Sequence, residues 1–274
     1  MTTTGTTITA PQATNKRGSN GLLLGFGNLL ANESRRWWFS KRWLTQMVVW
    51  VVIVNGFLAF LNWAITQDPQ TTGADITATR IEVFGELFPS LLCSTALGAI
   101  IAAMGTIVGE RQRGTAAWIL SKPVARSAFV LAKFLAYAAA LLPLTVLVPS
   151  VVFYGERTLL LGAPPVLGTF LVIIALAALH LLWYLCLTLF LGTIAQSHGT
   201  VAGVALGVLL GGQVLMQVVP DIALVLPHGL TGMAIALNTG RPLPATWPLT
   251  LGVVGTTALA LIILTLWRFG REEF

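Results

Sequence analysis

Six long apolar runs constrain this chain more than any other feature of its sequence. They fall at about residues 44–65, 87–108, 129–153, 166–191, 200–218 and 247–267. Each is close to the ~20 residues that an α-helix needs to cross a ~30 Å hydrocarbon core. Lipid offers the backbone no hydrogen-bonding partner, and the alternating strands of a barrel are absent, so the runs predict six transmembrane helices.

The charge content leads to the same class of protein. Of 274 residues, 55% are hydrophobic and only 9% are charged, against roughly 25% charged in an ordinary soluble domain. The sequence therefore predicts an all-α integral membrane protein. The net charge of +6 is explained by basic residues on the cytoplasmic side of a membrane, and we expect no nucleic-acid partner. No metal-ligand spacing occurs, and we expect no metal site.

The distribution of Lys and Arg predicts the orientation of the chain. With the N-terminus inside, the outer loops hold only Arg80, Arg157 and Arg241. The inner segments hold the other basic residues: Lys16, Arg17, Arg35, Arg36, Lys41, Arg42, Arg111, Arg113, Lys122, Arg126, Lys133, Arg268 and Arg271. Basic residues accumulate on the cytoplasmic side, so both termini are expected there, in the cell (plasma) membrane.

The segments outside the spanning region, which covers residues 44–267, differ in character. Residues 1–20 are Thr-rich and predict a disordered tail, and residues 268–274 form a short cytoplasmic tail. Residues 219–246 form an outer loop, in which "GLTGMAIALN" predicts a short helix that either rests at the outer interface or re-enters the membrane.

Residues 21–43, "GLLLGFGNLLANESRRWWFSKRW", predict an amphipathic elbow helix on the inner membrane surface. Apolar residues recur at helical spacing, and tryptophans stand among basic residues, as is typical of the headgroup level. A merely basic topology signal is the alternative. The residues of interest are Glu33, Arg35, Arg36, Trp37 and Trp38.

The polar residues argue against chemistry within this chain. All ten Asp and Glu are expected outside the spans or at their edges, and His180 alone lies in mid-span, which disfavours coupling to an ion gradient. No lysine follows a glycine, so no phosphate-binding loop is present, and neither H-E-x-x-H nor G-x-S-x-G occurs. We therefore expect no catalytic residue and no cofactor in this chain.

One basic stretch between the second and third runs, the loop at 109–126, stands out: "GERQRGTAAWILSKPVARSAFVLAKF" spans residues 109–134. Gly114 ends the preceding helix, Thr115 is the expected N-cap of a helix of about 10 Å, and Pro123 ends that helix. An apolar surface with a charged rim suits insertion into a groove on another protein; a tight loop on the membrane is the alternative. The candidate contact residues are Glu110, Arg111, Arg113, Gly114, Thr115, Trp118, Ile119 and Leu120, flanked by Lys122 and Arg126.

Four glycines recur at every fourth residue of the fifth run: Gly199, Gly203, Gly207 and Gly211. On a helix they form one smooth stripe, which lets two backbones approach closely in lipid. The partner is either another span of this chain or a second copy.

These segments resemble the type-2 ATP-binding-cassette exporter permeases. The loop is similar in its Glu, Gly-Thr, Ser-x-Pro, basic residue and Lys: Glu110, Gly114, Thr115, Ser121, Pro123, Arg126 and Lys133. "LLANESRRWWFSKRW", with Glu33 in the acidic position, resembles the elbow helix of that family, and "LPHGLTGMA", 226–234, resembles its outer loop. The resemblance covers essentially residues 21–270.

The resemblance implies a permease subunit of an exporter. Two copies, or this chain and a related one, would form the pore, and their first and fifth spans would meet at the dimer interface. Two separate ATPase subunits, which bind ATP and Mg²⁺, would grip residues 110–122 as the coupling helix. From the residues alone, an ion-coupled secondary transporter or channel and a non-transporting membrane signalling subunit remain alternatives.

Overall fold

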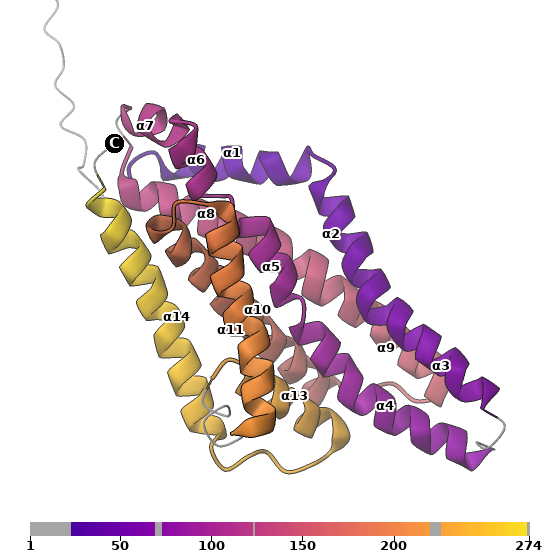
Figure 1. Ribbon diagram of the computed structural model, residues 1–274. Helices are drawn as coiled ribbons and strands as arrows, with labels where there is room; N and C mark the ends of the chain where they lie inside the picture. The colour runs from indigo at the N-terminus through magenta and orange to yellow at the C-terminus, as the bar shows by residue number, and fades with distance from the viewer. Residues whose placement is uncertain (1–22, 69–72, 123, 220–225, 273–274) are drawn as a thin grey trace, which may run out of the picture.

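The computed structural model describes residues 23–68, 73–122, 124–219 and 226–272, and all regular elements of these residues are helical (Figure 1). Two of the elements, labelled η, are π-helical. In chain order the elements are α1 (Phe26–Trp38), α2 (Arg42–Val51), η1 (Val52–Gly56), α3 (Phe57–Gln67), α4 (Ala74–Cys93), α5 (Ala96–Ala103), α6 (Val108–Gln112), α7 (Thr115–Leu120), α8 (Arg126–Leu141), η2 (Leu142–Leu147), α9 (Val148–Leu161), α10 (Leu167–Ile194), α11 (His198–Val218), α13 (His228–Thr239) and α14 (Trp247–Gly270).

Six segments of the described chain are long and apolar enough to cross a membrane. They are Arg42–Gln67, Asp75–Gln112, Arg126–Leu161, Leu167–Ile194, His198–Met216 and Trp247–Gly270. Each coincides with one of the six predicted runs, which confirms the prediction of an all-α membrane protein with six spans. The first three are composite, because π-helical turns or short breaks interrupt the α-helix within them.

The second span is longer than its apolar run predicted. Residues 75–86, expected in an outer loop, belong to α4, and that part of the prediction is wrong. Contacts at the end of the bundle stabilise this charged extension: Arg80 donates a hydrogen bond to the carbonyl of Leu160, and Glu86 pairs with Arg241 at 2.8 Å. An apolar run marks the depth of the hydrocarbon layer, whereas a helix continues as long as its backbone and side chains find partners.

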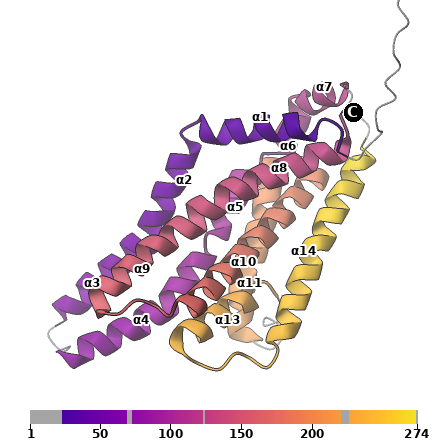
Figure 2. The same ribbon diagram turned by 180° about the vertical axis from the view of Figure 1, so that it is seen from behind.

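Helix α1 crosses one end of the bundle, where α6, α7 and the C-terminal end of α14 also lie (Figures 1 and 2). We call this the α1 end; α13, the end of α3 and the start of α4 lie at the opposite end. The elbow helix predicted over 21–43 is thus a helix over Phe26–Trp38, and a turn at residues 39–41 separates it from α2. Residues 21 and 22 lie outside the described part of the chain, as does the predicted tail at 1–20.

The basic residues divide between the two ends as the sequence predicted. Within the described chain, those assigned to the inner side lie on α1, the start of α2, the α6–α8 segment and the end of α14, which are all at the α1 end (Figure 1). Arg80, Arg157 and Arg241 lie at the other end. The structure thus has one strongly basic end.

Helix α10 forms the centre of the bundle. It is apolar around its whole circumference, as a helix surrounded by others should be, and it packs against α4, α5, α8, α11, α13 and α14. Beside it, stacked rings of Phe88 and Phe153, with centroids 3.7 Å apart, join α4 to α9. By contrast, the spans Arg42–Gln67, His198–Met216 and Trp247–Gly270 leave most of their surface outside the protein interior, for contact with lipid or a partner.

The short helix predicted in the outer loop is α13, His228–Thr239, and its existence is confirmed. It packs on α10 and α4, and the Asn238 amide donates hydrogen bonds to the carbonyls of Phe84 and Gly85 at 3.2 and 3.1 Å. Residues 220–225 of this loop lie outside the described residues.

A glycine on α5 allows the first and second spans to approach closely. The Trp50 indole of α2 lies directly against Gly98, where a Cβ would overlap it, and its Nε1 donates to Gln46 at 3.0 Å. Trp50 is buried and Gly98 faces it, so no larger residue fits without moving the ring.

We predict that Gly98→Ala lowers the stability of the protein by about 1–3 kcal/mol, because the added methyl overpacks this contact. The control is Gly155→Ala on α9, where a Cβ meets nothing within 4 Å and where replacing a helical glycine should be neutral or slightly stabilising. Thermal unfolding of the detergent-solubilised protein measures both. Equal midpoints for the two variants would show that the Trp50–Gly98 contact does not limit packing.

Candidate functional site

The loop residues singled out in the sequence as contacts for another protein lie at the α1 end, in and between the short helices α6 and α7. Gly114 separates the two helices with a φ of +69°, a left-handed conformation that favours glycine. The backbone N–H of Trp118 donates to the carbonyl of Gly114 at 3.1 Å, so Gly114 takes the N-cap position. The predicted break at Gly114 and the predicted short helix are confirmed.

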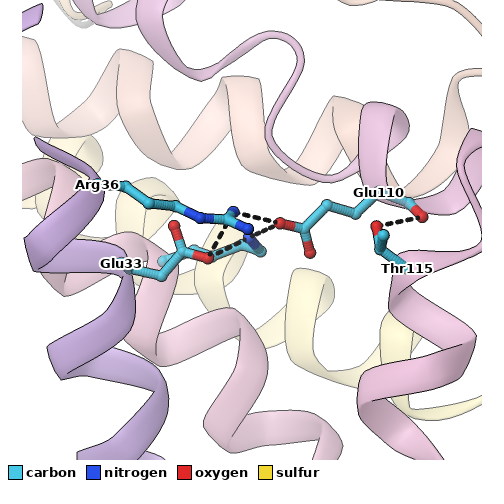
Figure 3. A network of polar contacts seen from close by, with 5 residues as sticks. Glu33, Arg36, Glu110 and Thr115 are labelled. Atoms are coloured by element: carbon cyan, nitrogen blue, oxygen red, sulfur yellow. Dashed lines mark hydrogen bonds and ion pairs between the residues drawn. The ribbon is translucent and has the colours of Figure 1, made fainter. Parts of the chain in front are cut away.

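The N-cap role predicted for Thr115 is wrong. Thr115 is the first residue of α7, and its hydroxyl donates to the backbone carbonyl of Glu110 at 3.2 Å (Figure 3). This bond links the first residue of α7 to the backbone of α6 across the turn between them. The two helices therefore form one compact unit.

A buried charged network joins this unit to α1 and α8. Lys133 Nζ lies 2.8 Å from Glu33 Oε1 on α1 and 2.8 Å from Glu110 Oε1 on α6. Arg36 Nη1 is 3.1 Å from the same oxygen of Glu110 and 3.6 Å from Glu33 Oε1 (Figure 3). Two carboxylates thus face two cations, and the four side chains connect three elements distant in sequence.

Three members of this network, Glu33, Glu110 and Lys133, are withdrawn from solvent, whereas Arg36 is exposed. The side chains of Lys133 and Glu110 are 2% and 4% exposed, and an unpaired charge at such positions would be strongly unfavourable. Glu110 was expected in an exposed charged rim; it is buried, and that expectation is wrong. The physical reason is Lys133, which lies about two turns into α8 with its ammonium group buried. This charge is stabilised only if carboxylates lie beside it, and Glu110 is one of them.

Arg111 also turns toward the protein. Its Nη1 donates to the carbonyls of Gly192, Thr193 and Ala195 at the end of α10, at 3.4, 3.4 and 3.2 Å. Its Nη2 pairs with Glu272, which follows α14, at 2.6 Å. Arg111 therefore connects α6 to the α10–α11 junction and to the C-terminal segment, so its predicted place in the rim is also wrong.

What α7 presents outward is an aromatic ring among basic residues. Trp118 is 63% exposed, and Lys122 Nζ lies 3.8 Å from the centroid of its ring. Arg113 is exposed on the turn before the helix, whereas Ala116 is buried and Ile119 packs on the main core. The side chain of Leu120 and the whole of Pro123 lie outside the described part of the structure.

The elbow residues divide between the two faces of α1. Trp37 is buried and meets Tyr137 of α8 edge-on, with ring centroids 5.1 Å apart, and Glu33 is buried in the network. Arg35 and Trp38 are exposed on the other face, and Arg36 is exposed but extends to Glu33 and Glu110. Helix α1 is therefore amphipathic, as predicted, and fixed to α8.

The glycine stripe of α11 faces away from the other described residues. A Cβ at Gly203, Gly207 or Gly211 would meet nothing within 4 Å, and one at Gly199 would meet only the Ser197 hydroxyl of the same segment. Within the part of the chain that the structure describes, the stripe therefore has no intrachain packing partner, which was one of the two alternatives. The neighbouring Gly212 has that use, because the His228 ring of α13 lies against it.

The architecture, the two short helices and the amphipathic α1 can now be compared with known proteins. The sequence profile described as ABC-2 family transporter protein matches residues 28–274. The chain belongs to the ABC-2 family. It is also similar to the uncharacterized transmembrane protein YxlG of Bacillus subtilis (strain 168), with 25% identity over 204 residues that cover 74% of this chain and 75% of YxlG.

Membership of the ABC-2 family makes this multi-pass chain a transmembrane permease subunit of an ATP-binding-cassette transporter. The family implies association with ABC ATPase subunits. Among the described residues no group of three or more His, Cys, Asp or Glu is placed to hold a metal ion.

Sequence reasoning predicted helices at the positions of α1 and α7 in this ABC-2 permease but missed the contact that joins α1 to α6. Lys133 was identified only as a basic residue entering the third span. One signal could have narrowed its role: a lysine two turns into an apolar helix must be neutralised, and the acids expected on its side of the membrane are Glu33, Glu110, Glu272 and Glu273.

We predict that Lys133→Met lowers stability by about 3–5 kcal/mol, because two buried carboxylates lose their shared cation. Adding Glu33→Gln and Glu110→Gln should restore most of the loss. The matched control is Arg241→Gln, which breaks the exposed pair with Glu86 and should cost at most about 1 kcal/mol. Thermal unfolding measures the Lys133→Met protein, the triple variant and the Arg241→Gln control. A Lys133→Met protein as stable as Arg241→Gln would refute the role of this network.

Proposed function

We propose that this permease is an exporter subunit in the cell membrane, driven by two separate ATPase subunits that bind its α1 end through α7. ATP and Mg²⁺ would be bound by those subunits. The observation that carries the proposal is the geometry of α7, a short helix that presents the exposed Trp118 outward. The adjoining α6 is fixed to α1, α8 and the end of α10. The outward direction of transport is supported by the resemblance of the loop and elbow to exporter permeases.

The distribution of basic residues supports placing the α1 end in the cytoplasm, where an ATPase would meet it. Lys and Arg accumulate in short loops on the cytoplasmic side of the membrane. Most basic side chains of the described residues lie at the α1 end. In this orientation α1 lies at the inner headgroup level, with Trp38 and Phe39 exposed toward lipid.

The contacts behind α7 suggest how a motion of the ATPase would reach the spans. Glu110 joins α6 to α1 and α8 through Lys133, and Arg111 joins α6 to the end of α10. A displacement of α7 would therefore be felt by the second, third and fourth spans together. Coupling of this kind requires that the ATPase bind the two conformations of the permease with different affinity.

The open stripe of α11 supports pairing with a second permease chain. Gly203 and Gly207 leave a smooth surface beside the exposed side chains of Val204 and Val208. In lipid, close backbone packing of this kind favours association of helices. A second copy or a related chain would place its own stripe, or its first span, against α11.

Replacing Trp118 tests the coupling contact. We predict that Trp118→Asp abolishes both co-purification of the ATPase subunits and their stimulation in proteoliposomes, because a carboxylate replaces the exposed aromatic ring. The control is Leu159→Asp at the opposite end, which is also an exposed apolar residue and should leave both unchanged. Full ATPase association and transport with Trp118→Asp would refute the coupling assignment.

Replacing Gly207 tests the pairing of permease chains. We predict that Gly207→Leu shifts the detergent-solubilised permease from dimer to monomer, measured by native mass spectrometry, with no change in the thermal midpoint of the monomer. Gly252→Leu on α14, where a Cβ also meets nothing within 4 Å, is the control. A dimer that persists with Gly207→Leu, or one that Gly252→Leu also dissociates, would contradict the assignment of this face.

A further inference from the structure

A cavity of about 1110 Å³ lies at the α1 end, between α1, the start of α2 and the segment from α5 to α7. Six basic side chains line it, against two carboxylates. The basic residues are Arg35, Arg36, Lys41, Arg42, Arg113 and Lys133.

The two carboxylates are already neutralised. Glu33 and Glu110 both contact Lys133 Nζ at 2.8 Å, and Arg36 lies within ion-pair distance of both. Within the described chain, the other four cations have no acidic partner, and all four are exposed. The cavity therefore has an excess of positive charge that no side chain of the described residues compensates.

The walls also hold buried polar atoms without partners. The Thr106 hydroxyl lines the cavity, and its oxygen is buried with no hydrogen-bond partner among the described residues. Glu110 Oε2 is buried and unpartnered in the same way. A hydroxyl of this kind can donate to an anion, whereas the carboxylate oxygen needs a donor.

From this geometry we infer a binding site for a phosphate ester that also carries a hydroxyl or ammonium group. The guanidinium groups of Arg35 and Arg113 and the Lys41 ammonium would contact the phosphate oxygens, because arginine forks match phosphate geometry. Glu110 Oε2 would accept from the hydroxyl or ammonium group. Glycerol- or ethanolamine-bearing phosphates have this chemistry.

Two sources could supply such a group: the headgroup of a phospholipid, or a soluble phosphate ester. The exposed Trp38, Phe39 and Leu44 beside the cavity are apolar side chains at the same level of the bundle, which suits contact with the acyl chains of a lipid. The inference concerns binding, and it holds whether or not the bound molecule is transported or an ATPase is attached.

Isothermal titration of the full-length protein in detergent tests the site. The probes are dihexanoylphosphatidylglycerol, sn-glycerol 3-phosphate and dihexanoylglycerol, which has the same tails and no phosphate. We expect Arg35→Gln and Arg113→Gln each to weaken binding of the phosphate-bearing probe about tenfold, the effect of losing one charge-assisted contact. Arg113→Lys should retain most of the affinity, because the charge remains.

The control variant is Arg268→Gln. Arg268 is a basic residue at the same end of the bundle that does not line the cavity, and its replacement should change the affinity less than twofold. Tighter binding of phosphatidylglycerol than of glycerol 3-phosphate identifies a lipid as the source, and equal binding identifies a soluble ester; either result supports the site.

Three results would overturn the inference. They are equal binding of dihexanoylglycerol, no binding of either phosphate compound, and equal weakening by Arg268→Gln and Arg113→Gln. Because Arg35 and Arg113 are exposed and have no acidic partner among the described residues, their variants should fold. Unchanged thermal midpoints check this directly.

Discussion

The ion pairs of Lys133 with Glu33 and Glu110 are the interaction on which the arrangement of the α1 end depends. A buried lysine is tolerated only with neutralising partners, and here those partners come from α1 and α6. The same contact therefore fixes the elbow helix across the bundle and holds the α6–α7 unit against α8. A different position of α1 or α6 would separate its carboxylate from Lys133. Because these groups are nearly removed from water, an unpaired carboxylate there would be strongly unfavourable.

Much of the fold could be predicted from the sequence, because lipid leaves the backbone few options. The six spans, the amphipathic α1, the short helix after Gly114 and the helix in the outer loop all follow from local patterns. The extension of α4 over residues 75–86 could not be predicted, because its contacts are made with residues far along the chain. Glu86 pairs with Arg241, which follows α13, and Arg80 donates to the carbonyl of Leu160 on α9. The inward orientation of Glu110 and Arg111 likewise depends on residues far along the chain.

The glycines show the same limit. Spacing identified the stripe of Gly203 and Gly207, yet the sequence alone could not distinguish a second copy from an intrachain neighbour. The structure shows that the close approaches within the chain are made elsewhere, at Gly98 against Trp50 and at Gly212 against His228. A single glycine opposite one large ring leaves no periodic signal, so only the fold reveals it.

The π-helical segments η1 and η2 have a mechanical consequence. They interrupt the first and third spans partway along their length, η1 contacts α4 and α9, and η2 contacts α2 and α10. The second span breaks nearby, between α4 and α5. The i→i+5 bonds of π-helical turns replace the regular bonds of an α-helix, so these three spans share a layer at which the continuous α-helix is interrupted. We expect a force applied at one face of the membrane to bend the bundle at this layer, so that each half moves as a rigid block.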